Sequence, residues 1–117
     1  MEREPPRKIP VVFYRTAAGA EVVRDWLRGL DDEDRNAIGM DLMRVQFRWP
    51  VGMPLCRPMG DGLSEVRTSL SGNRIARVLF CVHEGRILAL SGFIKKTQKT
   101  PPAELALARK RMKEFTG

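Results

Sequence analysis

One predicted strand and its neighbour carry residues suited to holding a phosphate. Glu65, Arg67 and Ser69 alternate along Leu63–Leu70, which predicts that these side chains share the polar face of a strand. Arg77 lies in mid-strand among apolar neighbours, and an arginine removed from water needs an anionic partner. The strand pattern favours a cross-strand ion pair with Glu65, and a bound phosphate is the alternative.

A second basic segment joins a predicted strand to a predicted helix. Residues 93–100 read Phe-Ile-Lys-Lys-Thr-Gln-Lys-Thr, so Lys95, Lys96 and Lys99 come directly before a helix start. The unpaired N–H groups and positive dipole end of a helix favour a phosphate, and Phe93 could stack on a base. A solvated surface loop with Phe93 in the core is equally compatible with this pattern.

The remaining candidate residues carry less specific signals. Arg74 precedes Arg77 by three positions, so the two arginines point to opposite faces of their strand unless a bulge intervenes. His83 falls in the predicted turn His83-Glu84-Gly85, which favours a turn residue over an acid or base. The last predicted helix has a basic cluster, Arg109, Lys110, Arg111 and Lys113, opposite a buried stripe of Leu105, Ala108 and Met112. The cluster suits a nucleic-acid backbone or a solvated face.

Composition limits the class of protein. The chain has 117 residues, 43% hydrophobic and 30% charged, which predicts one globular domain over residues 1–117. Residues 1–56 hold nine basic and nine acidic side chains, whereas residues 57–117 hold twelve and five. The net charge of +7 therefore lies in the second half, which favours a polyanion such as nucleic acid or an acidic protein as partner.

Several kinds of protein and site do not fit the sequence. The first ten residues alternate charges with prolines and contain no apolar signal segment, so we expect a soluble, cytoplasmic protein with residues 1–8 as a candidate disordered segment. No apolar run approaches the roughly 18 residues of a membrane helix. Cys56, Cys81 and the single histidine have no metal-ligand spacing, so we expect free, reduced thiols and neither metal nor cofactor.

Hydrophobic periodicity predicts seven elements in the order β-α-α-β-β-β-α. They are a strand over Ile9–Tyr14, helices over Ala17–Leu30 and Asp31–Trp49, strands over Leu63–Leu70, Asn73–Val82 and Arg86–Ile94, and a helix from Pro101 to about Phe115. Thr16 offers the first helix a cap, and the Gly- and Pro-rich segment Val51–Gly62 is predicted to be a loop. This order describes an α+β domain in which an N-terminal strand and a helical hairpin pack on a curved, mostly antiparallel sheet with a C-terminal helix.

Three segments together carry a family resemblance: Leu63-Ser-Glu-Val-Arg-Thr-Ser-Leu70, Gly72-Asn-Arg-Ile-Ala-Arg-Val-Leu-Phe80 and Gly92-Phe-Ile-Lys-Lys-Thr-Gln-Lys-Thr-Pro101. In this succession, and over nearly its whole length, the chain resembles the phage-derived HigB-like branch of the RelE toxin superfamily. The resemblance implies a RelE-like fold and the toxin of a type II toxin–antitoxin system. Such a toxin is an mRNA interferase that cleaves mRNA in the ribosomal A site, and a HigA-like helix-turn-helix antitoxin neutralises it.

The chemistry that the resemblance implies is metal-free RNA cleavage. The ribose 2′-OH attacks the adjacent phosphate and leaves a cyclic phosphate and a free 5′-hydroxyl, which requires a base, cations and an acid. Arg67 and Arg77 match basic sheet positions that would hold the scissile phosphate, and Glu65 is the base or the residue that orients Arg67. The family's basic strand-to-helix segment, which would supply the acid and electrostatic support, is matched by Lys95, Lys96 and Lys99.

The C-terminal part departs from the family's pattern. Several RelE relatives carry a catalytic tyrosine or histidine near the C-terminus, whereas Tyr14 and His83 are the only residues of these types here. We therefore expect a slow enzyme, or one that relies on the ribosome to align the RNA. The alternative is a non-catalytic basic module that binds nucleic acid or a protein. In either case the candidate RNA-binding residues are Arg74, Phe93, Lys99, Arg109, Lys110 and Lys113.

Overall fold

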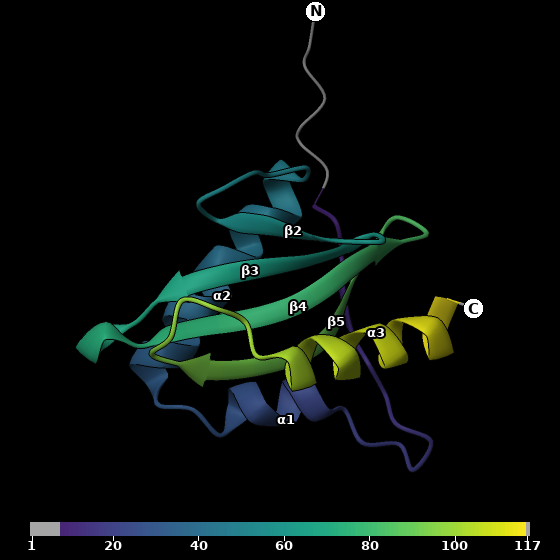
Figure 1. The fold of residues 1–117 in the computed structure, drawn as a ribbon, viewed down its shortest axis with the longest axis horizontal. Coiled ribbons are helices and arrows are strands. Elements are labelled where there is room, and N and C mark those ends of the chain that lie inside the picture. Colours follow the sequence, from purple (N-terminus) through teal and green to yellow (C-terminus); the bar gives the residue numbers. More distant parts are fainter. Residues whose placement is uncertain (1–7, 117) are drawn as a thin grey trace, which may run out of the picture.

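Within residues 8–116, which the computed structural model describes, five strands form one sheet in the order β1-β5-β4-β3-β2 (Figure 1). The strands β2 (Cys56–Gly60), β3 (Leu63–Ser69), β4 (Ile75–His83) and β5 (Arg86–Lys95) are antiparallel neighbours, and β1 (Val11–Phe13) pairs with β5 in parallel. Helices α1 (Val22–Arg28) and α2 (Asp32–Arg48) cover one face, and α3 (Pro102–Thr116) lies on the other. The predicted α+β architecture is confirmed. The prediction of disorder over residues 1–8 falls mainly on residues 1–7, which lie outside the described residues.

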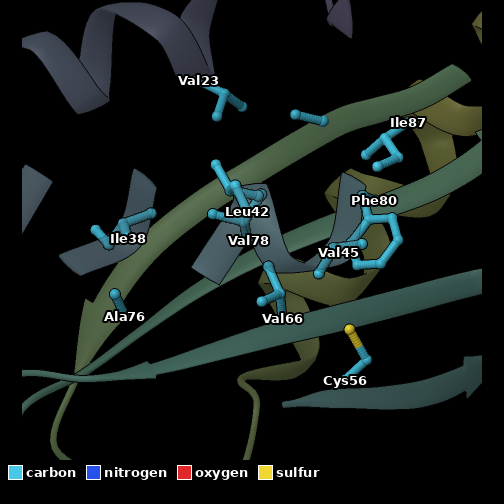
Figure 2. Close-up of a cluster of buried hydrophobic side chains, with 11 residues drawn as sticks. Val23, Ile38, Leu42, Val45, Cys56, Val66, Ala76, Val78, Phe80 and Ile87 are labelled. Atoms are coloured by element: carbon cyan, nitrogen blue, oxygen red, sulfur yellow. The ribbon is translucent and has the colours of Figure 1, made fainter. Parts of the chain in front are cut away.

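Alternation along the strands separates two apolar clusters. Val66, Val78 and Phe80 point toward α1 and α2, where they meet Ile38 and Val45 in the larger cluster (Figure 2). The opposite face of the sheet packs against the stripe predicted for the last helix: Ala108 is fully buried, and Leu105 and Met112 are partly buried. The two faces therefore have separate cores, and the polar residues Glu65, Arg67 and Arg77 belong to the α3 face.

The first helix is shorter than predicted. The chain from Thr16 to Ala20 forms a turn in place of the first helical turns of the predicted Ala17–Leu30, because Gly19 has a left-handed φ of +90°. The Thr16 hydroxyl accepts a hydrogen bond from the Ala20 N–H at 3.1 Å. Thr16 thus closes this turn and does not cap the helix.

The prediction of a continuous loop over Val51–Gly62 is wrong, because β2 lies within it. Pro58 is tolerated in this strand because β2 is the edge of the sheet, where a missing N–H leaves no partner unpaired. Asp61 and Gly62 join β2 to β3 with φ values of 55° and 85°. An Asp-Gly pair of this kind is a strong hairpin signal, so this strand could have been found from the sequence.

A bulge in β5 determines which side chains lie beside the arginines. Leu79 is opposite Ser91 whereas Phe80 is opposite Ala89, so Leu90 is the extra residue. Beyond the bulge the alternation reverses, and Phe93 lies directly opposite Arg77. No bulge was predicted here.

The packing of α1 against β5 depends on a glycine. A Cβ added to Gly92 would lie 2.5 Å from Cε3 and Cζ3 of the Trp26 ring. We expect Gly92→Ala to lower the free energy of unfolding by about 1–3 kcal/mol, because the indole and the strand must move apart. Urea denaturation would measure this, and in a Trp26→Leu background the same change should cost less.

Gly39 provides the matched control for this prediction. It lies within α2, where an added Cβ would meet nothing within 4 Å. Gly39→Ala should therefore raise the free energy of unfolding by about 0.5–1 kcal/mol, through helix propensity alone. Equal effects of the two substitutions would contradict the steric account.

Candidate functional site

Two arginines face each other on the α3 side of the sheet. Arg67 of β3 is directly opposite Arg77 of β4. Glu65 Oε1 lies 3.5 Å from Arg67 Nε and 3.9 Å from Arg77 Nε, so one carboxylate serves both guanidinium groups. The predicted association of Glu65 with Arg77 is present, but the distance is at the outer limit of an ion pair and Arg67 shares the carboxylate.

The connection between β5 and α3 covers these residues. Arg67 Nη2 donates to the Gln98 carbonyl at 3.0 Å and to Gln98 Oε1 at 3.1 Å. Arg77 Nη2 donates to the Thr97 carbonyl, and the Thr100 hydroxyl donates to Glu65 Oε2. Backbone and side-chain groups of this connection therefore supply part of the hydrogen bonding of a charged cluster in the sheet.

The two arginines differ in their access to solvent. The Arg67 side chain is 16% exposed, whereas those of Arg77 and Glu65 are 0% exposed. Burial, and then the charge of Arg67, lower the pKa of Arg77, while Glu65 acts in the opposite direction. Arg77 Nε, Arg77 Nη1 and Glu65 Oε1 are buried without a hydrogen-bond partner, so two donors of the Arg77 guanidinium remain unused within the described residues.

Two open pockets adjoin at this end of the sheet. The first, of ≈ 490 Å³, is lined by Arg67, Ser69, Ile75 and Gln98, by the apolar segment 53–55 and by Asp41 of α2. The second, of ≈ 330 Å³, shares Ser69, Ile75 and Gln98 and adds the side of Lys96. Arg67 and Lys96 therefore border two neighbouring pockets that share three lining residues.

Comparison with known protein families bears on the function of these two pockets. The family described as "Phage derived protein Gp49-like (DUF891)" matches residues 25–113, a range that includes all the candidate site residues. The chain belongs to this family. Gp49-like proteins form part of the RelE/ParE-like toxin superfamily of toxin–antitoxin systems, and the family implies an antitoxin partner. No curated protein matches the chain.

Lysines of the β5–α3 connection are open to solvent in this Gp49-like protein. Lys95, Lys96 and Lys99 are all exposed, with Lys95 at the last position of β5. Phe93 is only 7% exposed and packs in the α3-side cluster, where its ring centroid lies 5.8 Å from Arg77 Cζ. The ring is thus occupied by the arginine, and the predicted stacking on a base would require it to be uncovered.

The other basic candidates are divided between internal contacts and solvent. Both Nη atoms of Arg74 donate to Asp34 of α2, at 2.7 and 2.9 Å, on the face opposite Arg77 as the strand alternation predicts. Arg109 donates to the Met59 and Gly60 carbonyls beside the β2–β3 turn. The exposed members of the α3 cluster are Lys110 and Lys113.

Tyr14 and His83 lie at the far end of α3. The Tyr14 hydroxyl donates to Glu114, and the His83 ring packs edge-on against Phe115 at 6.1 Å. The cluster at Glu65 contacts residues just before the start of α3, roughly 18 Å away along the helix axis. Neither residue can replace the C-terminal tyrosine or histidine of the relatives at this site.

Sequence reasoning missed Gln98 and the carbonyl of Thr97 as parts of the site. A glutamine between lysines carries no pattern of its own, and a backbone carbonyl is present at every position. Thr100 was expected only as part of a helix start. Its contact with Glu65 joins residues 35 positions apart and carries no local signal.

Among residues 8–116, no group of three or more His, Cys, Asp or Glu side chains is placed to hold a metal ion. No helix in that part of the chain is long and apolar enough to span a membrane. Cys56 and Cys81 are free and buried, and burial raises the pKa of the Cys56 thiol to about 11.

The ion pair between Arg74 and Asp34 predicts a pH-dependent stability. The hydrogen bond and charge of Arg74 lower the pKa of Asp34 below 3.8, so the pair stabilises the fold above that pH and is lost as the pH falls through the folded-state value. Arg74→Met should therefore lower the urea midpoint at pH 7, and the difference from the unmodified protein should shrink by pH 3. Arg86→Met, which alters an exposed arginine outside this pair, is the control. An equal difference at both pH values would contradict this assignment.

Proposed function

We propose that this Gp49-like protein is a HigB-like toxin that acts as a ribosome-dependent mRNA endonuclease. The observation that carries the proposal is the placement of Arg67. Its guanidinium borders an open pocket beside Lys96 and is oriented from behind by the buried Glu65. A planar guanidinium held in this way is suited to multidentate contact with a phosphate.

The reaction that fits these groups is attack of a ribose 2′-OH on the adjacent phosphate. Arg67 and Arg77 would stabilise the charge that develops on the phosphate oxygens, and Lys95 or Lys96 would protonate the leaving 5′-oxygen. Glu65 is fully buried and accepts the Thr100 hydroxyl, which supports a positioning role toward the arginines over the role of base. The 2′-OH gives its proton to solvent water as the 2′-oxygen bonds to phosphorus, and the bond to the 5′-oxygen breaks as that oxygen takes a proton from the lysine. The products are a cyclic phosphate and a 5′-hydroxyl.

Exposed lysines would guide the RNA backbone to this site. Lys96 and Lys99 flank Gln98 at the pocket, and Lys110 and Lys113 extend the positive surface along α3. Arg74 and Arg109 are bound by protein acceptors and would contribute charge at longer range. This arrangement holds phosphates without reading bases, which suits an enzyme whose substrate the ribosome presents.

We further propose a HigA-like helix-turn-helix antitoxin as the partner. The outer side of α2 exposes Met40, Met43 and Phe47, with exposed fractions of 53%, 44% and 43%. A shallow pocket of ≈ 600 Å³ lies beside the two methionines. Apolar side chains exposed together in this way suit a protein partner, and they lie on the helix-hairpin side, away from Arg67.

Expression of the chain alone in a bacterial host tests the proposed activity. We expect growth arrest and new mRNA 5′ ends inside translated reading frames, and Arg67→Ala should reduce cleavage on the order of 100-fold or more, because a preorganised charge on the phosphate is lost. Mapping of mRNA 5′ ends measures both effects.

The matched control is Arg86→Ala, because Arg86 is an exposed arginine at the other end of β5 from Lys95. It should remain as toxic as the unmodified chain. Full toxicity of Arg67→Ala would refute the site. Normal growth at proven soluble expression would instead favour the non-catalytic binding module.

Free RNA should be a poor substrate for the purified protein. Within residues 8–116 no histidine or tyrosine lies beside the arginine pair to act as base, so alignment by the ribosome must supply part of the rate. We expect cleavage of mRNA in a translating extract and little cleavage of the same mRNA without ribosomes, measured by primer extension. Rapid digestion of the free mRNA would contradict ribosome dependence.

A further inference from the structure

The segment between β5 and α3 crosses the face of the sheet directly over the arginine pair. In Figure 1 this yellow-green segment passes in front of β4 before it enters α3. Residues 96–100, here named the strap, are exposed from 96 to 99 and buried at Thr100. The strap is therefore a thin covering whose outer side faces solvent.

The strap is held to the sheet by hydrogen bonds from the charged cluster. Arg77 donates to the Thr97 carbonyl, Arg67 donates to the carbonyl and side chain of Gln98, and Thr100 donates to Glu65. The oxygens offered to the two arginines are thus neutral amide oxygens. A phosphate adds a negative charge and a bidentate geometry that a neutral amide oxygen does not offer a guanidinium, so it would compete for these positions.

The closed arrangement leaves the cluster incompletely satisfied. Arg77 Nε and Nη1 and Glu65 Oε1 are fully buried and have no hydrogen-bond partner. A buried polar group without a partner carries a desolvation cost that a suitable ligand removes. Displacement of the Thr97 carbonyl would free Arg77 Nη2, and Nη2 together with the unpartnered Nη1 forms one edge of the guanidinium, which can hold an anion through two hydrogen bonds.

Access explains why this anion must move the strap. Arg67 borders the open pocket, whereas Arg77 is 0% exposed beneath Thr97. A phosphate can reach Arg67 from the pocket but reaches Arg77 only if the Thr97 carbonyl is displaced. The exposed Lys96 and Lys99 belong to the strap, so an RNA backbone bound to them would act directly on the segment that covers Arg77.

We propose that the strap closes the arginine pair in the free protein and is displaced when an RNA phosphodiester takes the places of the Thr97 and Gln98 carbonyls. This inference rests on the proposed function, since it describes regulation of the same site. Closure withholds Arg77 until a phosphate is delivered, and the apparent affinity for RNA is the affinity of the open form multiplied by the fraction of molecules that are open.

The test follows the side-chain Nε–H signals of Arg67 and Arg77 in a nitrogen–proton correlation spectrum, assigned with Arg67→Lys and Arg77→Lys. The probes are inorganic phosphate and a short RNA oligonucleotide with 2′-O-methyl groups, which cannot be cleaved. We expect both signals to shift together with either probe, at lower concentration of the oligonucleotide. Exchange of the buried Arg77 proton with solvent should also become faster as the strap opens.

A shift of Arg67 alone would overturn the inference, because the strap would then remain closed over Arg77. Absence of any shift would overturn it as well. Growth arrest in the expression experiment separates this result from the proposed function: a toxic protein whose Arg77 signal stays fixed retains the nuclease proposal and loses the strap.

A loosened strap supplies an independent measurement. Thr100→Val removes the hydroxyl that donates to Glu65, and the oligonucleotide should bind about fivefold more tightly, which corresponds to roughly 1 kcal/mol for one hydrogen bond. Thr68→Val is the matched control, since Thr68 is also buried in the sheet but points to the face opposite Arg77. The Thr68→Val protein should bind the oligonucleotide as tightly as the unmodified protein. Unchanged affinity of Thr100→Val would contradict the proposal that the strap closes the site.

A second variant applies if Thr100→Val fails to fold. Gln98→Ala removes an acceptor of Arg67 at an exposed position, and it should also tighten binding of the oligonucleotide.

Discussion

Two positively charged side chains lie directly opposite each other in neighbouring strands, and a single buried carboxylate makes this arrangement stable. Like charges at such positions repel, and burial of Arg77 increases the cost. Glu65 Oε1 faces both guanidinium groups, while Oε2 accepts the Thr100 hydroxyl and so joins the sheet to the segment before α3. The site, the course of the β5–α3 connection and the start of the last helix all depend on this carboxylate.

One face of the sheet forms the main apolar core, and the other carries the charged cluster of the candidate site. The face under α1 and α2 is apolar and well buried, which provides a rigid base. On the other face, the cluster around Ala108 supports α3, and the polar cluster lies beyond the start of that helix. The charged cluster thus lies on strands fixed by both cores and is covered by a polar connection that hydrogen-bonds to it.

The net charge does not show which basic side chains are available to a nucleic acid, because some of them are paired within the protein. The sequence places the whole excess of +7 in the second half, yet a tertiary contact brings an acidic residue of the first half to it. Asp34 of α2 pairs with Arg74, which precedes β4, and backbone carbonyls accept hydrogen bonds from Arg109. Among the candidate RNA-contacting residues, the basic side chains that remain exposed are Lys95, Lys96, Lys99, Lys110 and Lys113.

Local periodicity was enough to predict the positions of the helices and of four strands, the buried stripe of α3, and the opposite directions of Arg74 and Arg77. These features depend on neighbours a few residues apart, which sequence patterns record directly. The edge strand β2 was missed although Asp61-Gly62 signals its turn, because Pro58 and the glycines around it indicated a loop. The start of α1 was placed too early because Thr16 resembles a cap, whereas Gly19 turns the chain.

The sequence by itself determined the chemistry available to the site: a carboxylate and two arginines on one face of a sheet, followed by a lysine-rich connection. Only the tertiary structure decided that Arg77 is buried while Arg67 is open, that the bulge at Leu90 places Phe93 beside Arg77, and that Thr97 and Gln98 cover the pair. The physical reason is that burial and backbone hydrogen bonds arise from segments distant in the chain. Every residue has a backbone carbonyl, so the residue type does not indicate which carbonyl will accept a hydrogen bond from an arginine.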